Sequence, residues 1–236
     1  MRIGFDAKRA FLNNTGLGNY SRDTIRVLSN YFSNNKYFLY TPKTKENSRL
    51  TFLKSNSNTF ICTPKSLLSR ALKSYWRSKN IVKDLFTNKI DIYHGLSHEL
   101  PLGIEKTSIK SVVTIHDLIF IRYPHLFSTI DRKIYFKKFR SACERADKII
   151  AISEQTKQDI IDFLEIPESK ITVVYQGCNN IFQKPIAESK KKKILKKYNI
   201  PTKYLLNVGS IEERKNLLTL LQALKELPNQ KLVVIG

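Results

Sequence analysis

The sequence predicts an α/β fold, in which an open parallel sheet is followed by a linker and a second strand-helix-strand segment. Two observations lead to this prediction. Short apolar runs, which are typical of buried strands, alternate with stretches whose apolar residues recur at helical spacing. The chain has 236 residues, of which 42% are hydrophobic, so it can bury a sizeable core and form one or two domains.

The clearest strand, loop and helix lie near the end of the chain. Residues 204–208 form an apolar run that stops at Gly209, and we expect this run to be a buried strand. A helical pattern begins at Asn216, and Arg214 and Lys215 stand directly before it. Their charges would add to the free N–H groups and the positive end of the helix dipole. This arrangement predicts an anion site with a diphosphate as its natural occupant, although a solvated turn with ordinary surface charges has the same spacing.

At the other end of the chain, residues 2–7 are expected to form the first strand. A polar stretch with Gly16, Gly18 and Tyr20 follows, and a helical pattern continues to about residue 32. A dinucleotide-binding fingerprint is excluded because Ser21 stands where the third glycine is required. We interpret the stretch as a flexible glycine loop that lines a cleft, with Tyr20 available to stack or to donate a hydrogen bond. A simple helix-entry turn is the alternative.

Residues 36–40 and 59–62 are the next predicted strands, and a surface excursion over residues 42–58 separates them. Residues 66–87 have a helical pattern, with Leu68, Leu72 and Trp76 on one face and basic residues on another. Such a helix could lie on an anionic membrane. We favour the other interpretation, in which it packs on the sheet and its charges face water.

Two predicted strands end in polar side chains that can bind a ligand or take part in catalysis. Residues 91–95 end with His94 and Gly95, and an apolar run from residue 111 leads directly into His116 and Asp117. Ligands of an open parallel sheet bind at the carboxyl ends of its strands, so these side chains are expected to face one crevice. Nothing in the sequence distinguishes His98 or His125 from surface residues.

The rest of the chain continues the alternation of helices and strands. Ser153 is a suitable N-cap for the last helix of the first half. The expected helices cover residues 129–146, 154–164 and 188–198, and the expected strands cover residues 148–153, 171–175 and 231–235.

Composition limits the function classes. The net charge of +21 predicts attraction to phosphates, nucleic acid or an anionic membrane. No nucleic-acid motif accompanies this charge and the basic residues are scattered, so we expect no nucleic-acid partner. The three cysteines (Cys62, Cys143 and Cys178) are widely spaced and form no disulfide or metal pattern, which favours a reducing cytoplasm. No signal peptide or membrane-spanning run is recognisable, so we expect a soluble or peripheral protein.

Six motifs occur in a single order along nearly the whole chain. They cover residues 16–20, 91–94, 114–117, 151–154, 174–177 and 208–216. In this order they resemble glycosyltransferase family 4, a group of retaining, sugar-nucleotide-dependent enzymes with the GT-B fold, and especially its bacterial mannosyltransferase-like members. The resemblance implies a Rossmann-like N-terminal domain, with a doubly wound parallel sheet, and the start of a second Rossmann-like domain.

The resemblance also implies where the donor lies. Arg214 and Lys215 would hold the donor diphosphate in the loop that begins at Gly209, and fixed cations there would neutralise the departing leaving group. Gly16 and Gly18 would lie against the donor phosphate or sugar. The nucleotide sugar is a substrate, and neither a metal ion nor another cofactor is expected.

His116 and Asp117 are the catalytic residues that the resemblance implies. His116 would contact the donor sugar, and Asp117 would orient that sugar or the acceptor. Tyr20 and His94 would line the same cleft. The acceptor is expected to react on the face from which the leaving group departs, without a nucleophile from the protein.

The implied function is transfer of a hexose, with mannose as the first candidate, to a cell-surface polysaccharide or lipid-linked glycan with retention of configuration. Residues 1–176 would form the acceptor-side domain, residues 177–187 a linker, and residues 188–236 the incomplete start of the nucleotide-sugar-binding domain. The family's Glu-x7-Glu segment is missing from these residues, so we expect the chain alone to transfer little or no sugar.

An alternative from another class is a non-catalytic acceptor-domain subunit that pairs with a separately encoded nucleotide-binding half. In either case we expect the protein in the cytoplasm. A further hypothesis is that it attaches peripherally to the inner face of the plasma membrane. The sequence names neither the nucleotide base, the acceptor nor the oligomeric state.

Overall fold

The computed structural model describes residues 1–45 and 47–236, without the side chains of Leu68 and Asn180. Glu46, in the expected surface excursion, and the Leu68 side chain, expected on an apolar helix face, therefore lie outside the description. The chain divides into two compact units, Met1–Gly177 and Cys178–Gly236. Each unit is described by itself below.

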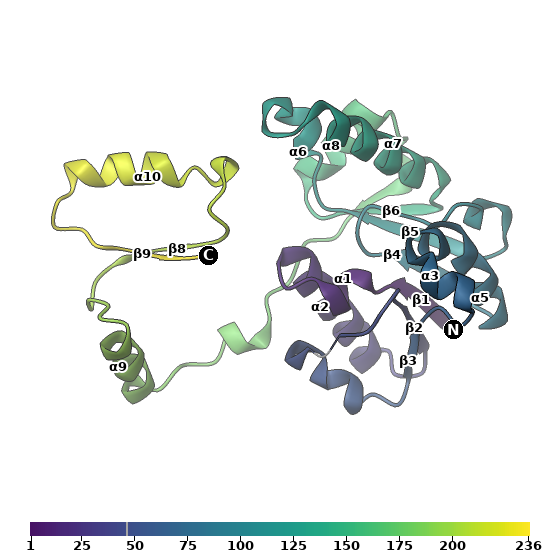
Figure 1. The fold of residues 1–236 in the computed structure, drawn as a ribbon, viewed down its shortest axis with the longest axis horizontal. Helices are drawn as coiled ribbons and strands as arrows, with labels where there is room; N and C mark the ends of the chain where they lie inside the picture. Colours follow the sequence, from purple (N-terminus) through teal and green to yellow (C-terminus); the bar gives the residue numbers. More distant parts are fainter. Residues whose placement is uncertain (46) are drawn as a thin grey trace. The chain divides into compact units, whose positions relative to one another are not determined.

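Unit 1 contains a seven-stranded sheet in which every pair of neighbouring strands is parallel (Figure 1). The strand order is β3-β2-β1-β4-β5-β6-β7, so the direction of winding reverses between β1 and β4. This is the predicted doubly wound α/β fold. The strands are β1 (Arg2–Asp6), β2 (Lys36–Tyr40), β3 (Thr59–Cys62), β4 (Ile92–Gly95), β5 (Lys110–Ile115), β6 (Lys148–Ala151) and β7 (Ile171–Val173).

Helices cover both faces of this sheet, and the side chains of β2 illustrate the two layers. Tyr37 and Leu39 enter one buried apolar cluster, whereas Phe38 and Tyr40 enter the other. Alternate residues of a strand point to opposite faces, so each cluster is the core of one face. The α-helices are α1 (Lys8–Leu12), α2 (Gly16–Tyr31), α3 (Leu67–Ala71), α4 (Lys73–Tyr75), α5 (Ile81–Thr87), α6 (Ile119–Arg122), α7 (Thr129–Arg145) and α8 (Glu154–Leu164).

Shorter helical turns connect several of these elements. They are η1 (Ser48–Lys54), η2 (Trp76–Asn80), η3 (Ile104–Lys106), η4 (Pro124–Leu126) and η5 (Glu168–Lys170). Of these turns, η2 is a π-helical turn that joins α4 to α5.

The expected glycine loop after β1 is wrong, and the helix-entry alternative is correct. Helix α1 intervenes after the strand, and α2 begins at Gly16, so Gly16, Gly18 and Tyr20 belong to its first turns. The Asn13 side chain accepts hydrogen bonds from the backbone N–H groups of Thr15 and Gly18, at 2.9 and 3.0 Å, and so fixes this entry. A Cβ atom at Gly18 would lie 1.9 Å from the carbonyl oxygen of Asn13, so a glycine is required for this close approach.

The predicted helix over residues 66–87 is broken into α3, α4, η2 and α5. Trp76 is 1% exposed, and its indole Nε1 donates a hydrogen bond to Asp84 Oδ2 at 2.7 Å. Arg77 pairs with Asp6 and Glu99. Trp76 belongs to the core of one sheet face, so the segment packs on the sheet as we favoured. The expectation that its charges face water is wrong for Arg77, whose side chain is 17% exposed.

Unit 2 is a β-α-β arrangement in which β8 (Leu205–Val208) and β9 (Leu232–Ile235) pair in parallel. Its helices and turns are η6 (Asn180–Phe182), α9 (Glu188–Lys197), η7 (Glu213–Lys215), α10 (Leu217–Ala223) and η8 (Leu224–Glu226). The expectation that β8 is buried is wrong for this chain, because Leu206 is 54% and Val208 70% exposed. A two-stranded sheet with one short helix covers few of its own side chains.

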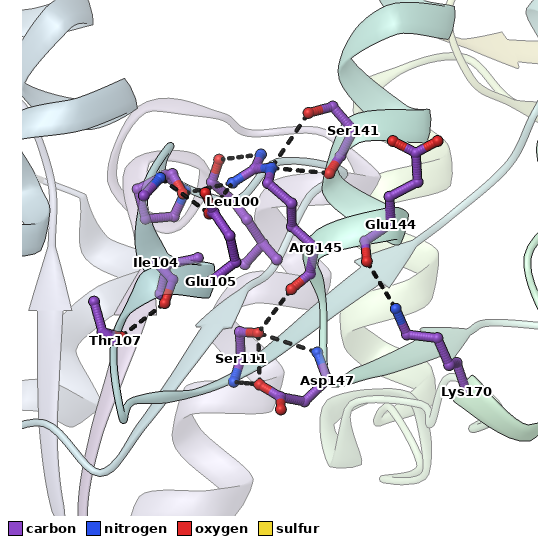
Figure 2. A network of polar contacts seen from close by, with 12 residues as sticks. Leu100, Ile104, Glu105, Thr107, Ser111, Ser141, Glu144, Arg145, Asp147 and Lys170 are labelled. Carbon is purple, nitrogen blue, oxygen red and sulfur yellow. Dashed lines mark hydrogen bonds and ion pairs between the residues drawn. The ribbon is translucent and has the colours of Figure 1, made fainter.

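A network of polar contacts around Arg145 joins the start of β5 and β6 to the segment that follows β4 (Figure 2). The Arg145 guanidinium donates hydrogen bonds to the carbonyl oxygens of Leu100 and Pro101, at 3.2 and 2.7 Å, and to the carbonyl oxygen of Ser141 at 3.0 Å. Ser111, at the start of β5, donates through its N–H and its hydroxyl to the carboxylate of Asp147. This network supports the amino ends of the central strands.

We expect Arg145→Ala to lower the free energy of unfolding of unit 1 by about 2–3 kcal/mol, because three backbone carbonyl groups lose a charged donor. Urea unfolding followed by the fluorescence of Trp76, the single tryptophan, measures this change. Arg140→Ala is the matched control, since Arg140 pairs only with the exposed carboxylates of Glu144 and Glu165 among the described residues. Equal unfolding midpoints for the two variants would contradict the assigned role of Arg145.

Candidate functional site

The candidate site lies at the carboxyl edge of the unit 1 sheet, where β1, β4 and β5 end side by side. The winding of the sheet reverses between β1 and β4, and the carboxyl edge at such a reversal is where open α/β sheets bind ligands. His94 lies on β4, and His116 follows β5. The topology therefore brings the two predicted histidines to one place.

Thr114, on β5, links His94 to Tyr20. The Thr114 hydroxyl lies 2.8 Å from His94 Nε2 and 3.0 Å from the hydroxyl of Tyr20. Thr114 and His94 are buried. Because a hydroxyl group donates one hydrogen and accepts others, one threonine holds side chains from β4 and α2 in fixed positions.

His116 is also buried, and its ring has partners at both nitrogen atoms. Nε2 lies 3.0 Å from the carbonyl oxygen of Leu96, which only accepts, so this nitrogen carries the hydrogen. In the neutral ring Nδ1 then accepts, and the amide nitrogen of Gln176 donates to it at 3.4 Å. The edge of the ring meets Tyr20 with centroids 4.6 Å apart. His116 is therefore held as a specific neutral tautomer.

His98 is a member of this cluster that sequence reasoning missed. Its ring stacks on Phe139 of α7 at 4.3 Å, and it meets the His116 ring at 5.1 Å. The interpretation of His98 as a surface residue is wrong. It follows β4 by a few residues, so the argument from carboxyl ends that selected His94 could have selected His98 as well.

Burial lowers the pKa of all three histidines. The pKa of His94 falls to about 4, with a smaller contribution from the neighbouring His116. The pKa values of His98 and His116 are lowered mainly by burial; His116 and then the positive charge of Arg9 lower that of His98 further, and Arg9 also lowers that of His116. Burial also raises the pKa of Tyr20. Around neutral pH the cluster therefore presents uncharged donors and acceptors of hydrogen bonds.

Asp117 differs from the buried histidines, because its side chain is exposed. Its Oδ1 accepts a hydrogen bond from the backbone N–H of Ile119 at 3.3 Å. The negative charge nevertheless lies close enough to raise the pKa of His116 against the effect of burial. The sheet thus places His116 and Asp117 at the same edge, with the histidine inside and the carboxylate facing water.

The two N-terminal glycines occupy different environments. A Cβ atom at Gly16 would meet no other atom within 4 Å, whereas Gly18 packs against the turn after α1. Their predicted contact with the donor stays a prediction. What the first turns of α2 contribute directly is Tyr20, which reaches Thr114 and His116.

The residues of the predicted anion site belong to unit 2. Gly209 directly follows β8 with a φ of 150°, and a Cβ atom there would meet nothing within 4 Å. Arg214 and Lys215 lie in the turn η7, and Arg214 Nε pairs with Glu212 Oε2 at 2.6 Å. Asn216, with a left-handed φ of 53°, ends this turn and precedes α10. The strand, cationic turn and helix follow one another as expected, and the ligand assigned to them stays a prediction.

A charged network also lies at the carboxyl edge of unit 1. Arg77 Nη1 pairs with the buried Asp6 at 2.9 Å, Arg77 Nη2 pairs with Glu99, and Lys138 reaches Glu99 at 3.3 Å. Among the residues that the structure describes, no three His, Cys, Asp or Glu side chains are placed to hold a metal ion. None of the described helices has both the length and the apolar character needed to cross a membrane.

We expect the free energy of unfolding to decrease as the pH falls from about 6.5 toward 4. In this range the histidines are protonated in the unfolded chain but stay neutral in the folded protein. Each such histidine therefore contributes up to about 1.4 kcal/mol per pH unit to the slope of the free energy of unfolding. Urea unfolding followed by Trp76 fluorescence at a series of pH values measures the slope. His94→Asn removes one of the groups, so its slope should be shallower than that of the unchanged protein. Identical slopes would show that the pKa of His94 is the same in the folded and unfolded states, which contradicts the effect of burial.

Several solved structures share this fold. A glycosyltransferase from Rickettsia africae ESF-5 matches all of this chain and 60% of its own, with a TM-score of 0.62 and 16% identity. WaaG, a glycosyltransferase involved in lipopolysaccharide biosynthesis, matches 99% of this chain and 63% of its own, with a TM-score of 0.63 and 16% identity. Anabaena Alr3699/HepE in complex with UDP-glucose gives a TM-score of 0.60 at 14% identity, over all of this chain and 69% of its own. At these identities the similarity establishes the fold.

Sequence relatives and a family profile are more specific. The O-antigen chain mannosyltransferase B of Escherichia coli is 30% identical over 139 residues, which are 58% of this chain and 35% of that protein. A serotype-specific mannosyltransferase WbdA of Escherichia coli is 29% identical over 138 residues, 57% of this chain and 17% of that protein. The chain thus spans about a third or less of the length of these relatives. The profile of Glycosyltransferase Family 4 matches residues 15–180, which is more than half of the chain. This chain therefore belongs to glycosyltransferase family 4.

Proposed function

We propose that this chain is part of a retaining glycosyltransferase that moves a hexose, with mannose as the first candidate, from a nucleotide sugar to a bacterial glycan. The observation that carries the proposal is the array of the buried His94, Thr114 and His116 with the half-buried Tyr20 at the carboxyl edge of the sheet. This array lies within the part of the chain that matches the family.

The protonation state of the array suits a sugar. Sugar hydroxyl groups are neutral and both donate and accept hydrogen bonds, so neutral imidazole, phenol and hydroxyl groups can recognise them. A diphosphate, in contrast, requires fixed positive charge. The lowered pKa values of His94 and His116 support the sugar site that we propose for unit 1, and the cations of η7 in unit 2 are the candidates for the diphosphate.

In the proposed reaction the bond between the sugar and the donor diphosphate breaks, and the diphosphate leaves with the bonding electrons. Arg214 and Lys215 would stabilise the negative charge that develops on it. An acceptor hydroxyl group would attack on the same face and release its proton to the leaving phosphate oxygen. His116 would hold the sugar through the side of its ring that now faces Gln176, and Asp117 would orient the sugar or the acceptor.

The relatives indicate the substrate class. The two curated relatives are mannosyltransferases, one of them of the O-antigen chain, and the Anabaena structure holds UDP-glucose. We therefore infer a nucleoside diphosphate hexose as donor and a cell-surface polysaccharide or lipid-linked glycan as acceptor. The alternative of a non-catalytic subunit is not favoured, because these relatives are themselves transferases.

We also infer a cytoplasmic protein with a peripheral membrane contact at the start of α7. Ile130 is 72% and Ile134 45% exposed, and Tyr135 is exposed beside them. Lys133 and Lys137 are exposed on the same helix. Apolar side chains one helical turn apart, flanked by lysines, suit the interface of an anionic bilayer.

The first test is donor binding by isothermal titration calorimetry with GDP-mannose, UDP-glucose and the matching free nucleoside diphosphates. We expect binding of at least one donor, and we expect Arg214→Gln combined with Lys215→Gln to weaken it about tenfold or more, because two charges that face the diphosphate are lost. Lys225→Gln, an exposed lysine of unit 2, is the control and should leave the affinity unchanged. EDTA should have no effect, since the proposed chemistry uses no metal ion. If no donor binds in either the presence or the absence of Mg²⁺, the proposed function fails.

The membrane contact is tested by sedimentation with vesicles. We expect the protein to sediment with anionic vesicles and not with neutral ones, and we expect Ile130→Ser combined with Ile134→Ser to reduce this binding at least fivefold, since apolar burial is lost. Leu67→Ser, which changes the exposed leucine of the other basic segment, should have no effect. Equal sedimentation with both kinds of vesicle would contradict the proposal, and loss of binding in Leu67→Ser alone would move the contact to α3.

A further inference from the structure

Helix α1 places two basic residues at the carboxyl edge of the sheet, directly after β1. Ala7, Ala10 and Phe11 are buried in the core of one sheet face. Lys8 and Arg9 lie on the remaining side of this short helix and are half-buried. Their position is set by the packing of the apolar residues, so these two charges are held beside the point where the winding reverses.

The charges around α1 do not balance. Asp6 and Glu99, the two carboxylates of the charged network, are already paired with Arg77 and Lys138. Among the described residues, no hydrogen bond or ion pair involves the side-chain nitrogen atoms of Lys8 or Arg9. Together with the paired Arg77 and Lys138, these two cations give the edge a formal excess of two positive charges over Asp6 and Glu99, which the exposed carboxylate of Asp117 reduces to one.

The cations are close enough to influence one another. Burial lowers the pKa of Lys8, and the positive charges of Arg77 and Arg9 lower it further, against a smaller opposing effect of the carboxylates of Asp6 and Glu99. The charge of Arg9 also lowers the pKa values of His98 and His116. Half-buried like charges that form no direct ion pair are unfavourable, and groups perturbed in this way gather at binding sites. A bound anion would remove the imbalance.

We propose that Lys8 and Arg9 form an anion subsite that binds the phosphate or diphosphate group of the glycosyl acceptor. This assignment to the acceptor rests on the proposed function, in which the donor diphosphate is held by Arg214 and Lys215 of unit 2. A guanidinium group contacts two phosphate oxygens at once, and an ammonium group adds a point charge, so the pair suits a phosphate.

The phosphate could come from two sources, namely an isoprenyl diphosphate of the acceptor type or the nucleoside diphosphate of the donor. The test therefore compares the affinity of the full chain for inorganic pyrophosphate, geranyl diphosphate and the nucleoside diphosphate of the donor. The variant is Lys8→Gln combined with Arg9→Gln. Lys54→Gln is the matched control, because Lys54 is an exposed lysine of unit 1 whose side chain has no hydrogen bond or ion pair among the described residues.

We expect the double variant to bind pyrophosphate and geranyl diphosphate about tenfold or more weakly, because two charge-assisted contacts are lost. Nucleoside diphosphate affinity should change less than about twofold, and Lys54→Gln should change none of the affinities. Unchanged affinity for geranyl diphosphate overturns the proposal. A loss confined to the nucleoside diphosphate also overturns it, because the subsite would then belong to the donor.

A second measurement needs no variant and applies even if the double variant does not fold. An anion that neutralises Arg9 must raise the pKa values of His98 and His116, which are followed by NMR of the histidine Cε1–H signals. We expect pyrophosphate to move both titrations to higher pH, and an absence of movement at saturating pyrophosphate contradicts the subsite. The experiments also separate failure of the subsite from failure of the proposed function. If only the proposed function fails, the chain binds no nucleotide sugar, but its affinity for pyrophosphate still depends on Lys8 and Arg9.

Discussion

The hydroxyl group of Thr114 is the contact on which the polar edge of unit 1 depends. It lies on β5 and meets His94 from β4 and Tyr20 from α2, so it joins three elements that are distant in the sequence. Each of these polar groups is taken out of water, and an unsatisfied buried polar group costs about 1–3 kcal/mol. The array is therefore stable only when it is complete. Its geometry is consequently fixed before any ligand arrives, which would lower the entropic cost of binding the proposed sugar.

The two edges of the sheet use polar groups for different purposes. At the amino edge Arg145 donates to backbone carbonyl groups, and Ser111 donates to Asp147 (Figure 2). These contacts satisfy the protein's own groups. At the carboxyl edge the histidines are held neutral, and two basic side chains of α1 have no partner among the described residues. The first arrangement holds strands together, whereas the second combines neutral side chains with two positive charges that form no ion pair among the described residues.

The fold and part of the site could be predicted from the sequence because they depend on local patterns. The bounds of β2 and β3 agree with the predicted runs, and the strand-end rule brought His94 and His116 to one edge. The rule did not find His98, which stacks on Phe139 of a distant helix, because such a contact leaves no periodic signal. The glycines of α2 were misjudged for a related reason: Gly18 is required by its approach to Asn13, which depends on the packing of α1 against α2. Lys8 and Arg9 were missed because their lack of partners is a property of the folded structure.

The strand order has a consequence for how the chain folds. All pairs in the unit 1 sheet are parallel, so none of them can form as a local hairpin. The interior strand β1 pairs with β2 on one side and with β4 on the other. On the β4 side Ile3 pairs with Ile92, a residue that is synthesised much later. During synthesis β1 is therefore made long before its second neighbour, and its apolar residues stay uncovered in the meantime. Such long-range pairing slows folding and exposes intermediates to aggregation, so the growing chain should depend on chaperones until β4 and β5 have left the ribosome.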